Sequence, residues 1–390
     1  MRTFYLLSAA ARSFDVTLVT PATTSVPHSV FETAGIRLRV APAGPRKAVN
    51  EAAKALSAGV RGEPYVMYRR HERAAIHQLF RGEAHQNRPD ILYFDHLDSF
   101  AYSGIAASGI TVCDLHNVYS LLAQRAANEQ TNVIRRAYLL REARLLAKVE
   151  SRVASQVDLL FSVSREEAEY FKGIGGQHVC VVPNGVDCDR YADLPTGRES
   201  ASPLVMYVGA MSWQPNAAAA RFLALEVLPA LRRRVPTVRV RIVGRDPLPD
   251  VVDLARQPGV EVTGRVDNIV PHLKEAHVLA VPLESGGGTR LKILEAFAAG
   301  LPVVSTPVGS EGIEAEPDRH LCVVPRERFA DTLLAVLASP ARGREMAAAA
   351  RALAREVYDW RVVGRTAVSA ITSALTSRVH TETPLREHPL

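Results

Sequence analysis

Short apolar segments alternate with helical segments along almost the whole chain, and this alternation is the strongest constraint on its fold. In the first half, the apolar segments occupy residues 15–21, 91–97, 111–117, 158–164 and 178–187. In the second half they recur at residues 203–211, 238–246, 260–267, 277–283, 301–309 and 320–325. Strands that are apolar throughout and separated by helices form parallel sheets covered on both faces. The pattern therefore predicts an α/β chain with two doubly wound domains in series.

The two series of strands are separated by a polar stretch at residues 187–204, which contains two prolines and is predicted to be a linker. We expect an N-terminal domain over residues 1–195 and a C-terminal domain over residues 196–355. A helix over residues 356–378 is expected to cross back to the N-terminal domain, and residues 379–390 are expected to form a tail.

The chain begins with a segment that looks helical, RTFYLLSAAARSF. A doubly wound domain normally opens with a strand and a glycine-rich turn, and the common strand order places that strand in the centre of the sheet. We therefore expect the N-terminal domain to lack its first strand in this sequence. Our interpretation is that the true start lies upstream of Met1.

Composition limits the classes of function. With 47% hydrophobic and 23% charged residues among 390, the chain has the balance of a globular protein with room for two cores. It lacks an apolar run of about eighteen residues and the layout of a signal peptide, so we expect a cytoplasmic location. The net charge of +6 suits anionic small molecules, phosphates or a membrane surface, but the basic residues are too dispersed to predict a nucleic-acid partner. The four cysteines form no CxxC pair and are expected to be reduced, with no metal site.

The sequence ESGGGTRLKILEAFAAGLPVVSTPV at residues 284–308 places three glycines directly before a predicted helix. Gly286, Gly287 and Gly288 permit backbone conformations closed to other residues and let a ligand approach the main chain. Thr289 is the predicted N-cap of the helix. A helix N-terminus presents unpaired N–H groups and the positive end of its dipole, so this segment is a candidate anion site.

Charged residues follow at the start of the same helix. Arg290 and Lys292 add positive charge where it disfavours the helix unless an anion binds, and a diphosphate would supply that anion. Glu295, one turn after Lys292, can accept two hydroxyl groups of a ribose. The alternative is a solvated Lys292–Glu295 pair on a surface helix. The position favours a ligand site, because the loop follows the strand at residues 277–283, at the edge where open α/β sheets bind ligands. The residues predicted to face the core are Leu291, Leu294 and Ala298.

The segment ESGGGTRLKILEAFAAGLPVVSTPVGSEGI closely resembles the nucleotide-sugar site of the family 4 glycosyltransferases, which have the GT-B fold. Other segments resemble further parts of this family. VPNGVD is similar to the hinge between its domains, MYVGAMSWQPN to the first strand and loop of its donor domain, and DLHNVYS to a turn of its N-terminal domain. The resemblance covers roughly residues 1–376. It implies an α/β GT-B fold in which two Rossmann-like domains face a central cleft.

The resemblance implies roles for residues of the C-terminal domain. Glu295 corresponds to the second acid of the family's E-x7-E motif, which is expected to hold the ribose. Gly287 stands where the first acid should contact the donor sugar, and Glu284 cannot be assumed to replace it. Arg290 and Lys292 are expected to bind the diphosphate and to stabilise its charge during catalysis. The full predicted nucleotide-binding set is Gly209, Gly286, Gly287, Gly288, Thr289, Arg290, Lys292 and Glu295.

In the N-terminal domain, His116 lies in the segment DLHN and resembles the family's cleft histidine near the reacting sugar. It is the predicted catalytic residue of this domain. Asp114 is expected either to hold this histidine or to cap the turn. Asp95 and His96 end another strand and are candidates to line the acceptor site. Tyr119 stands where the family usually has an acid, so the acceptor side is expected to differ.

The activity implied by the resemblance is retaining transfer of a sugar from a nucleotide diphosphate sugar to a hydroxyl acceptor, in cell-envelope or extracellular polysaccharide synthesis. No cofactor and no metal are expected, because cationic side chains bind the diphosphate. The expected acceptor is a glycan or a lipid-linked molecule. The basic amphipathic helix predicted at residues 133–153 is either a core helix or a peripheral contact with the inner face of the membrane.

Two other classes of function fit the sequence less well. A catalytically impaired or truncated paralogue of the same fold would only bind its ligands, and Gly287 and Tyr119 favour this alternative somewhat. A dinucleotide oxidoreductase requires a G-x-G-x-x-G turn after its first strand, and neither half of the chain has one. We therefore expect a glycosyltransferase, with the binding protein as the alternative.

Overall fold

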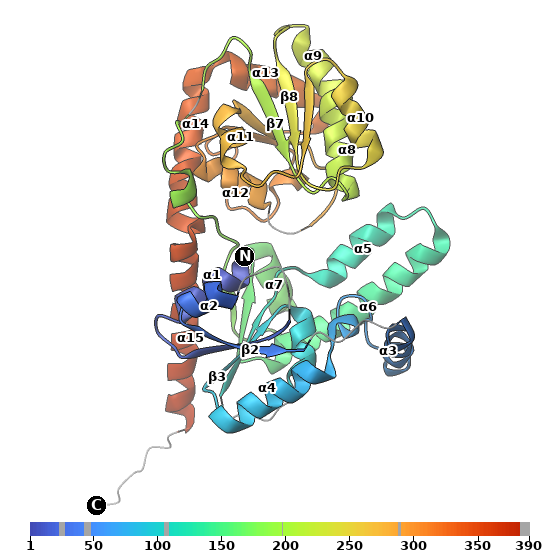
Figure 1. Cartoon of the computed structure of the whole chain (residues 1–390), viewed down its shortest axis with the longest axis vertical. Helices are drawn as coiled ribbons and strands as arrows, with labels where there is room; N and C mark the ends of the chain where they lie inside the picture. Colours follow the sequence, from blue (N-terminus) through green and yellow to red (C-terminus); the bar gives the residue numbers. More distant parts are fainter. Residues whose placement is uncertain (23–27, 43–47, 105–108, 197, 288–289, 383–390) are drawn as a thin grey trace, which may run out of the picture. The chain divides into compact units, whose positions relative to one another are not determined.

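The computed structural model describes residues 1–22, 28–42, 48–104, 109–196, 198–287 and 290–382. Contacts within the chain divide it into two compact units, each built from parallel strands and helices. Unit 1 contains Met1–Pro183 together with the chain from Val363 onward, and unit 2 contains Asn184–Val362. The first division between the units falls within the segment VPNGVD. Figure 1 shows both units and labels their elements.

The strands of unit 1 are β1 (Val16–Pro21), β2 (Ile36–Ala41), β3 (Ile91–Asp95), β4 (Ile110–Asp114), β5 (Leu159–Ser162) and β6 (Val179–Val181). Its helices are α1 (Arg2–Ala10), α2 (His28–Thr33), α3 (Ala48–Arg61), α4 (Ala74–Asn87), α5 (Tyr119–Glu129), α6 (Val133–Gln156) and α7 (Arg165–Gly173), together with α15 (Trp360–Glu382), which belongs to unit 1 from Val363. All five strands predicted in this half are present. The opening segment is a helix, as its sequence indicates.

The strands of unit 1 form two separate parallel sheets in the described residues, one of β1 and β2 and one in the order β3-β4-β5-β6. Strand β2 is not among the predicted strands, because Arg37 and Arg39 interrupt its apolar residues. In the four-stranded sheet, β4 and β5 are central and almost fully buried, as expected for strands covered on both faces. Helix α15 lies against α1 of the same unit, since a Cβ atom on Gly364 would lie 2.6 Å from Cβ of Ala9.

The strands of unit 2 are β7 (Leu204–Val208), β8 (Arg239–Val243), β9 (Val260–Gly264), β10 (Val278–Val281), β11 (Val303–Ser305) and β12 (Cys322–Val323). Its helices are α8 (Gln214–Phe222), α9 (Leu228–Arg232), α10 (Pro249–Asp253), α11 (Val270–Glu275), α12 (Leu291–Ala298), α13 (Phe329–Ala338) and α14 (Pro340–Leu353). Each of the six predicted strands is present. Figure 1 shows α8, α9 and α10 on one side of the sheet and α14 on the other. Helix α13 packs against α9, and the ring of Phe329 at its start contacts the ring of Phe222 at the end of α8.

The sheet of unit 2 is wholly parallel and has the order β12-β11-β10-β7-β8-β9. The chain runs outward in one direction from β7 to β9, then returns to β10 on the other side of β7. The order of strands therefore reverses between β7 and β10. In open α/β sheets, this switch point leaves a crevice at the carboxyl ends of the two strands, where ligands bind.

Helix α12 begins next to this switch point and packs into the core of unit 2 through Ile293, Leu294 and Phe297, which are fully buried. The predicted core position of Leu294 is confirmed, and so is that of Ala298. The prediction for Leu291 is wrong, because its side chain is 44% exposed. Leu291 is the first helical residue, and the buried stripe begins two residues later at Ile293.

All four cysteines are free thiols, as predicted. Among the described helices, none is both long enough and apolar enough to cross a lipid bilayer.

A buried ion pair joins α1 to the four-stranded sheet of unit 1. Nε and Nη2 of Arg2 donate to the two carboxylate oxygens of Asp114 at 2.9 and 2.7 Å, and Nη1 donates to the carbonyl of Pro183 at 2.8 Å. The side chains of Arg2 and Asp114 are 5% and 0% exposed. Removing one partner of such a pair leaves the other charge buried without compensation.

We therefore predict that Arg2→Met lowers the free energy of unfolding by roughly 3–5 kcal/mol in urea denaturation. Adding Asp114→Asn to this variant should recover part of the loss, because it removes the uncompensated carboxylate. Arg12→Gln, an exposed arginine just after the same helix, is the control and should change stability by less than about 0.5 kcal/mol. A loss for Arg2→Met as small as that of the control would show that the ion pair does not anchor α1.

Candidate functional site

The predicted nucleotide site lies at the switch point of unit 2, where two loops leave the carboxyl ends of β7 and β10. The first loop begins at Gly209, and a Cβ atom there would lie 2.6 Å from the side chain of Asn216 on α8. The second loop contains Gly286, whose φ of +116° favours glycine and whose Cβ would lie 2.4 Å from the ring of Trp213. Both glycines therefore allow a close approach that a side chain would block.

Lys292 extends from the first turn of α12 toward the end of β7. Its Nζ donates to the hydroxyl of Tyr207 at 3.2 Å and to Oδ1 of Asn216 at 3.1 Å, and it lies 4.4 Å from the centroid of the Tyr207 ring. Both hydrogen-bond partners are uncharged. In the part of the chain that the structure describes, no carboxylate oxygen lies within 4.0 Å of this nitrogen. The alternative of a Lys292–Glu295 ion pair is therefore not found.

Burial of Lys292, followed by the nearby charge of Arg290, lowers the pKa of its ammonium to about 7. The ring and hydroxyl of Tyr207 and the amide of Asn216 hold the nitrogen in place, and the Tyr207 hydroxyl itself donates to Asn216 Oδ1 at 2.6 Å. The site thus holds a cation that the protein solvates with dipoles and an aromatic face. An anion placed beside it would raise the pKa again and restore the full charge.

Arg290 is the N-cap residue of α12, and its side chain is 5% exposed. It donates to the carbonyl of Gly287 at 2.7 Å and to the carbonyl of Val308 at 3.2 Å, so it ties the glycine loop to the segment after β11. The predicted N-cap was the preceding residue. Thr289 lies outside the described residues, as does Gly288, and the helix begins one residue later than predicted.

Glu295 lies on α12 one turn beyond Lys292 and accepts a hydrogen bond from the hydroxyl of Tyr191 at 3.3 Å. Burial raises the pKa of Glu295, and this hydrogen bond opposes the shift. Glu284 forms an ion pair with Arg326 at 2.7 Å. Gly287, at the position of the missing acid, contributes only its carbonyl to Arg290.

Six of the predicted residues, Gly209, Gly286, Gly287, Arg290, Lys292 and Glu295, are therefore gathered around one switch point by the loop after β7 and the segment that leads into α12. Two residues that hold Lys292, Tyr207 and Asn216, were not predicted from the sequence. Both occur in the segment MYVGAMSWQPN. A buried tyrosine in a strand and an asparagine in the first turn of a helix are ordinary structural residues, so only the fold shows that they meet.

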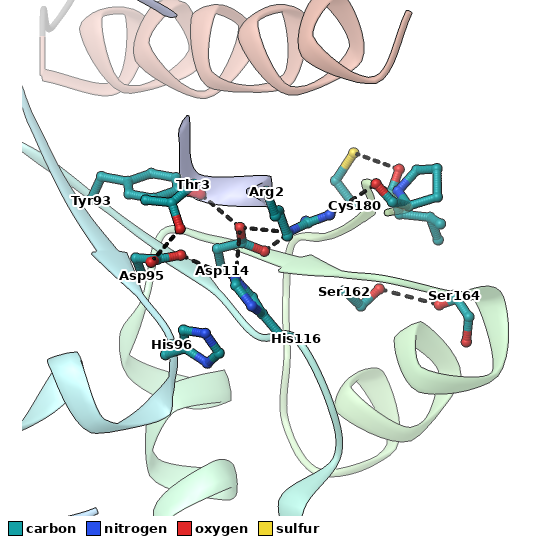
Figure 2. A network of polar contacts seen from close by, with 12 residues as sticks. Arg2, Thr3, Tyr93, Asp95, His96, Asp114, His116, Ser162, Ser164 and Cys180 are labelled. Carbon is teal, nitrogen blue, oxygen red and sulfur yellow. Dashed lines mark hydrogen bonds and ion pairs between the residues drawn. The ribbon is translucent and has the colours of Figure 1, made fainter. Parts of the chain in front are cut away.

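A second polar cluster lies in unit 1, where β3 and β4 end side by side (Figure 2). Asp95 and Asp114 are paired residues at the ends of these strands. His116 follows β4, and its Nε2 lies 3.0 Å from Oδ1 of Asp95 and 3.4 Å from Oδ2 of Asp114. Arg2 and the hydroxyl of Tyr93 also donate to Asp114, and Thr3 donates to Asp95 at 2.8 Å.

This arrangement makes His116 a cation. Burial alone would lower the pKa of His116, but the hydrogen bonds and charges of Asp114 and Asp95 outweigh it and raise the pKa to about 9. Asp114 remains ionised despite its complete burial, because the charge of Arg2 and the contact with His116 hold the pKa of this carboxyl well below its usual range. The expectation that Asp114 holds the histidine agrees with these contacts.

His96 lies directly beside His116, with ring centroids 3.6 Å apart. Its backbone has a φ of 72°, a conformation that is uncommon outside glycine. Its Nδ1 lies 2.7 Å from the hydroxyl of Tyr119, the residue that replaces the family's usual acid. Burial, followed by the charge of His116, lowers the pKa of His96. The pair therefore consists of one charged and one neutral imidazole at neutral pH.

Asp95, His96 and His116 could each offer one ligand atom to a metal ion, since these atoms all lie within 4.8 Å of one another. Nε2 of His116 already contacts two carboxylates, and Nδ1 of His96 contacts Tyr119. These contacts fit a hydrogen-bonded network in which His116 is protonated, because a metal would require that nitrogen to be free of its proton. The absence of a metal from the reaction stays a prediction.

Comparisons with known proteins agree with this division of the chain. The family model described as "Glycosyltransferase Family 4" matches residues 3–190, and the model described as "Glycosyl transferases group 1" matches residues 202–339.

Two of the curated relatives are mycobacterial mannosyltransferases. The chain is 27% identical over 239 residues to a GDP-mannose-dependent alpha-(1-6)-phosphatidylinositol monomannoside mannosyltransferase of Mycolicibacterium smegmatis, a match that covers 55% of the chain and 62% of the relative. It is 28% identical over 201 residues to a phosphatidyl-myo-inositol mannosyltransferase of Mycobacterium leprae, covering 48% of the chain and 52% of the relative. The chain thus matches only about half to three fifths of the length of these relatives.

Solved structures share the fold over nearly the whole chain. Sucrose-phosphate synthase from Thermosynechococcus elongatus superposes with a TM-score of 0.66 and 16% identity, covering 97% of this chain and 92% of that one. WaaG, a glycosyltransferase involved in lipopolysaccharide biosynthesis, gives a TM-score of 0.63 and 18% identity, with coverage of 95% and 94%. Anabaena HepE in complex with UDP gives 0.65 and 16%, with coverage of 97% and 96%. These proteins have the GT-B fold, and the two family models together extend over both units. The chain therefore has the GT-B fold and belongs to the family 4 glycosyltransferases.

Proposed function

We propose that this protein is a retaining glycosyltransferase that moves a sugar from a nucleoside diphosphate sugar, bound by unit 2, to a hydroxyl acceptor, bound by unit 1. The observation that carries the proposal is the ammonium of Lys292. It lies half-buried at the β7–β10 switch point, and its partners are a phenol and an amide. Desolvation of a charge without a counter-ion costs free energy. A diphosphate at this place would offset that cost.

Different residues around the switch point would bind different parts of the donor. Lys292 and the N-terminal N–H groups of α12 would contact the diphosphate. Gly209 and Gly286 would shape the site by letting Asn216 and Trp213 pack directly against the two loops. Arg290 would fix the glycine loop through its bonds to Gly287 and Val308. Glu295 would accept the ribose hydroxyls. Since Gly287 offers no carboxylate, the donor sugar would be bound differently from the family's usual pattern.

In the proposed step, the acceptor oxygen forms a bond to the anomeric carbon as the bond from that carbon to the diphosphate oxygen breaks. The acceptor proton passes to the departing diphosphate on the same face, so the configuration is retained. Lys292 stabilises the charge that develops on the diphosphate. His116 is a cation held by two carboxylates through Nε2, which leaves Nδ1–H as a hydrogen-bond donor for a sugar hydroxyl.

The names of the relatives suggest which substrates to test first. One of them is a GDP-mannose-dependent phosphatidylinositol monomannoside mannosyltransferase, and HepE has been solved with UDP-glucose. We therefore propose a hexose donor and a lipid-linked acceptor of the cell envelope. Cationic side chains at the diphosphate would make a metal unnecessary. These assignments rest on similarity, and the geometry of the two clusters is compatible with them.

The test is a transfer assay with the purified full chain, GDP- and UDP-hexoses, and polyprenol- or inositol-linked acceptors. Proton NMR of the product should show the anomeric configuration of the donor, and EDTA should leave the rate unchanged. Donor binding without transfer or hydrolysis across the panel would instead support the binding protein, which Gly287 and Tyr119 favour. Inversion of configuration would contradict the retaining mechanism.

Lys292→Met should reduce kcat/KM for the donor by about 10²–10³-fold, or ~2.7–4 kcal/mol, because it removes a charged contact to the diphosphate. Donor binding to the unmodified protein should take up a proton above pH 7, since the ammonium has a pKa of about 7 before the diphosphate arrives. Calorimetry in buffers of different ionisation enthalpy measures this uptake. Lys274→Met, which removes an exposed lysine of α11, is the matched control.

Lys292→Met should also stabilise the protein in the absence of a donor. The unfolded chain keeps Lys292 protonated up to about pH 10.5, whereas the folded chain loses the proton near pH 7. The desolvation cost is therefore complete below pH 7 and fades as the pH rises toward the unfolded value. Lys292→Met should raise the melting temperature most at pH 6 and least at pH 10. A lower melting temperature at pH 6 would assign Lys292 a structural role.

Asp95→Asn should lower the pKa of His116 from about 9, because it removes one of the two carboxylates that stabilise the imidazolium. The NMR titration of the His116 ring should show a lower midpoint, and the alkaline limb of the transfer rate should move to lower pH by the same amount. Asp90→Asn, at an exposed residue before the same strand, should leave both unchanged. If the NMR midpoint of His116 moved but the pH dependence of the transfer rate did not, His116 would have no role in the reaction.

Helix α6 supports peripheral contact with a membrane. Its second half is buried in the core of unit 1, from Glu142 to Ala154, as the core alternative predicts. Its first half is exposed, with Val133 at 78%, Ile134 at 81% and Tyr138 at 42%. The adjoining exposed residues Arg135 and Arg136 are basic, a combination that suits an anionic lipid surface.

Ile134→Asp should therefore weaken binding to vesicles that contain anionic lipids, because it replaces an inserted apolar group with a repelled charge. Vesicle flotation at low and high salt measures the effect. Val252→Asp, at an apolar residue of unit 2 that is 48% exposed, is the control. If Ile134→Asp and Val252→Asp bound the vesicles equally well, the first half of α6 would not be a membrane contact.

A further inference from the structure

Unit 2 has a cavity of about 450 Å³ at the edge of its sheet opposite the switch point. Its lining includes Pro203, His277 and Pro302, which lie immediately before or near the amino ends of β7, β10 and β11. All strands of the sheet are parallel, so this edge is remote from the carboxyl ends that hold Lys292. The cavity is thus separate from the proposed donor site.

One wall of the cavity carries Arg198. Its Nη1 donates to the carbonyl of Ala276 at 3.1 Å. Its other two nitrogens, Nε and Nη2, each expose less than 1 Å² and have no hydrogen-bond partner within the described residues. A buried donor without a partner costs roughly 1–3 kcal/mol, and more when it is charged. The guanidinium is therefore only partly satisfied by the protein itself.

The unsatisfied atoms form one edge of the guanidinium, and elsewhere in this chain that edge binds oxyanions. Nε and Nη2 of Arg2 bind both oxygens of Asp114, and the same two atoms of Arg69 bind both oxygens of Glu63. The two N–H donors of this edge form a fork whose spacing matches two oxygens of one carboxylate or phosphate. At Arg198 the same fork is buried but has no oxyanion among the described residues.

The charges near the cavity also favour an anion. Burial, followed by the charge of Arg351, lowers the pKa of Arg198 to about 10. Arg351 likewise has a buried Nε without a partner in the described chain. His277 accepts a hydrogen bond from the Leu204 N–H on Nδ1, so its neutral ring carries its proton on Nε2. The acid that lines the cavity, Glu199, is paired with Arg344 at 2.6 Å.

The remaining walls are largely apolar and include Pro302, Val336, Leu337 and Pro340. A volume of this size accommodates a small organic molecule rather than a single ion. The guanidinium of Arg198 supplies positive charge in the lining, and Arg351 lies near enough for its charge to act on Arg198. We propose that this cavity binds a small organic phosphate, whose phosphoryl oxygens take the Nε–Nη2 edge of Arg198 while its apolar part contacts the proline and aliphatic walls. Because those nitrogens are covered, binding requires the Arg198 side chain to shift into the open volume beside it.

The test uses the full chain with Lys292→Met, so that the proposed donor site does not add phosphate binding. Inorganic phosphate and phenyl phosphate are the probes, measured by equilibrium dialysis and by thermal unfolding. We expect one phenyl phosphate per chain, bound at least tenfold more tightly than inorganic phosphate. Adding Arg198→Gln should weaken binding at least tenfold, whereas adding Arg256→Gln, at an arginine with an 84% exposed side chain, should not.

The thermal measurement separates a ligand site from a structural arginine. Without phosphate, Arg198→Gln should unfold at the same or a higher temperature, because it removes a buried charge that lacks a counter-ion. Phenyl phosphate should raise the melting temperature of the parent but not of this variant. Undiminished phosphate binding by Arg198→Gln would overturn the proposal, and so would equal affinity for the two probes. Should Arg198→Gln fail to fold, Arg198→Lys keeps the charge but loses the fork, and the same loss of binding is expected.

Discussion

Parallel pairing of strands governs where chemistry can occur in this protein. When all strands of a sheet run the same way, their carboxyl ends meet at one edge, and the loops that follow them converge there. In unit 1 this brings together Asp95 and Asp114, which lie nineteen positions apart in the sequence but side by side in the sheet. In unit 2 it brings the loop after β7 next to the loop after β10. Both polar clusters depend on this single constraint.

The polar cluster of unit 1 and that of unit 2 differ in their electrostatics. In unit 1, two carboxylates at neighbouring strand ends would repel each other, and Arg2, Tyr93 and His116 supply the donors that keep Asp114 ionised. In unit 2, a cation is held by neutral dipoles and an aromatic ring, so it keeps an unmet preference for an anion. One cluster is complete without a ligand, and the other is not. This difference is why the proposed function rests on Lys292.

Much of the fold followed from the periodic alternation of apolar and helical segments. All eleven predicted strands are present, since buried parallel strands leave long apolar runs in a sequence. Strand β2 was missed because Arg37 and Arg39 divide its apolar residues. The burial of Leu291 was predicted wrongly, because helical periodicity does not reveal where the first turn meets the core.

The candidate site could be located from the glycines and charges before α12, but its partners could not. Tyr207 lies 85 positions from Lys292 and Asn216 lies 76 positions away, so nothing local connects them. The ion pair of Arg2 with Asp114 spans 112 positions and was likewise invisible in the sequence. Motifs identify residues that meet a ligand, whereas the residues that fix those side chains emerge only when the strands are in register.

The close approach of Trp213 to Gly286 has a practical consequence. The chain has two tryptophans, and Trp360 is buried with 5% exposure whereas Trp213 is 42% exposed. Trp213 lies on the loop after β7, against the glycine of the loop after β10. Its indole therefore forms a built-in optical probe of the switch point. Movement of either loop would alter the polarity around one fluorophore while the other provides a constant background, so occupancy can be followed without a label.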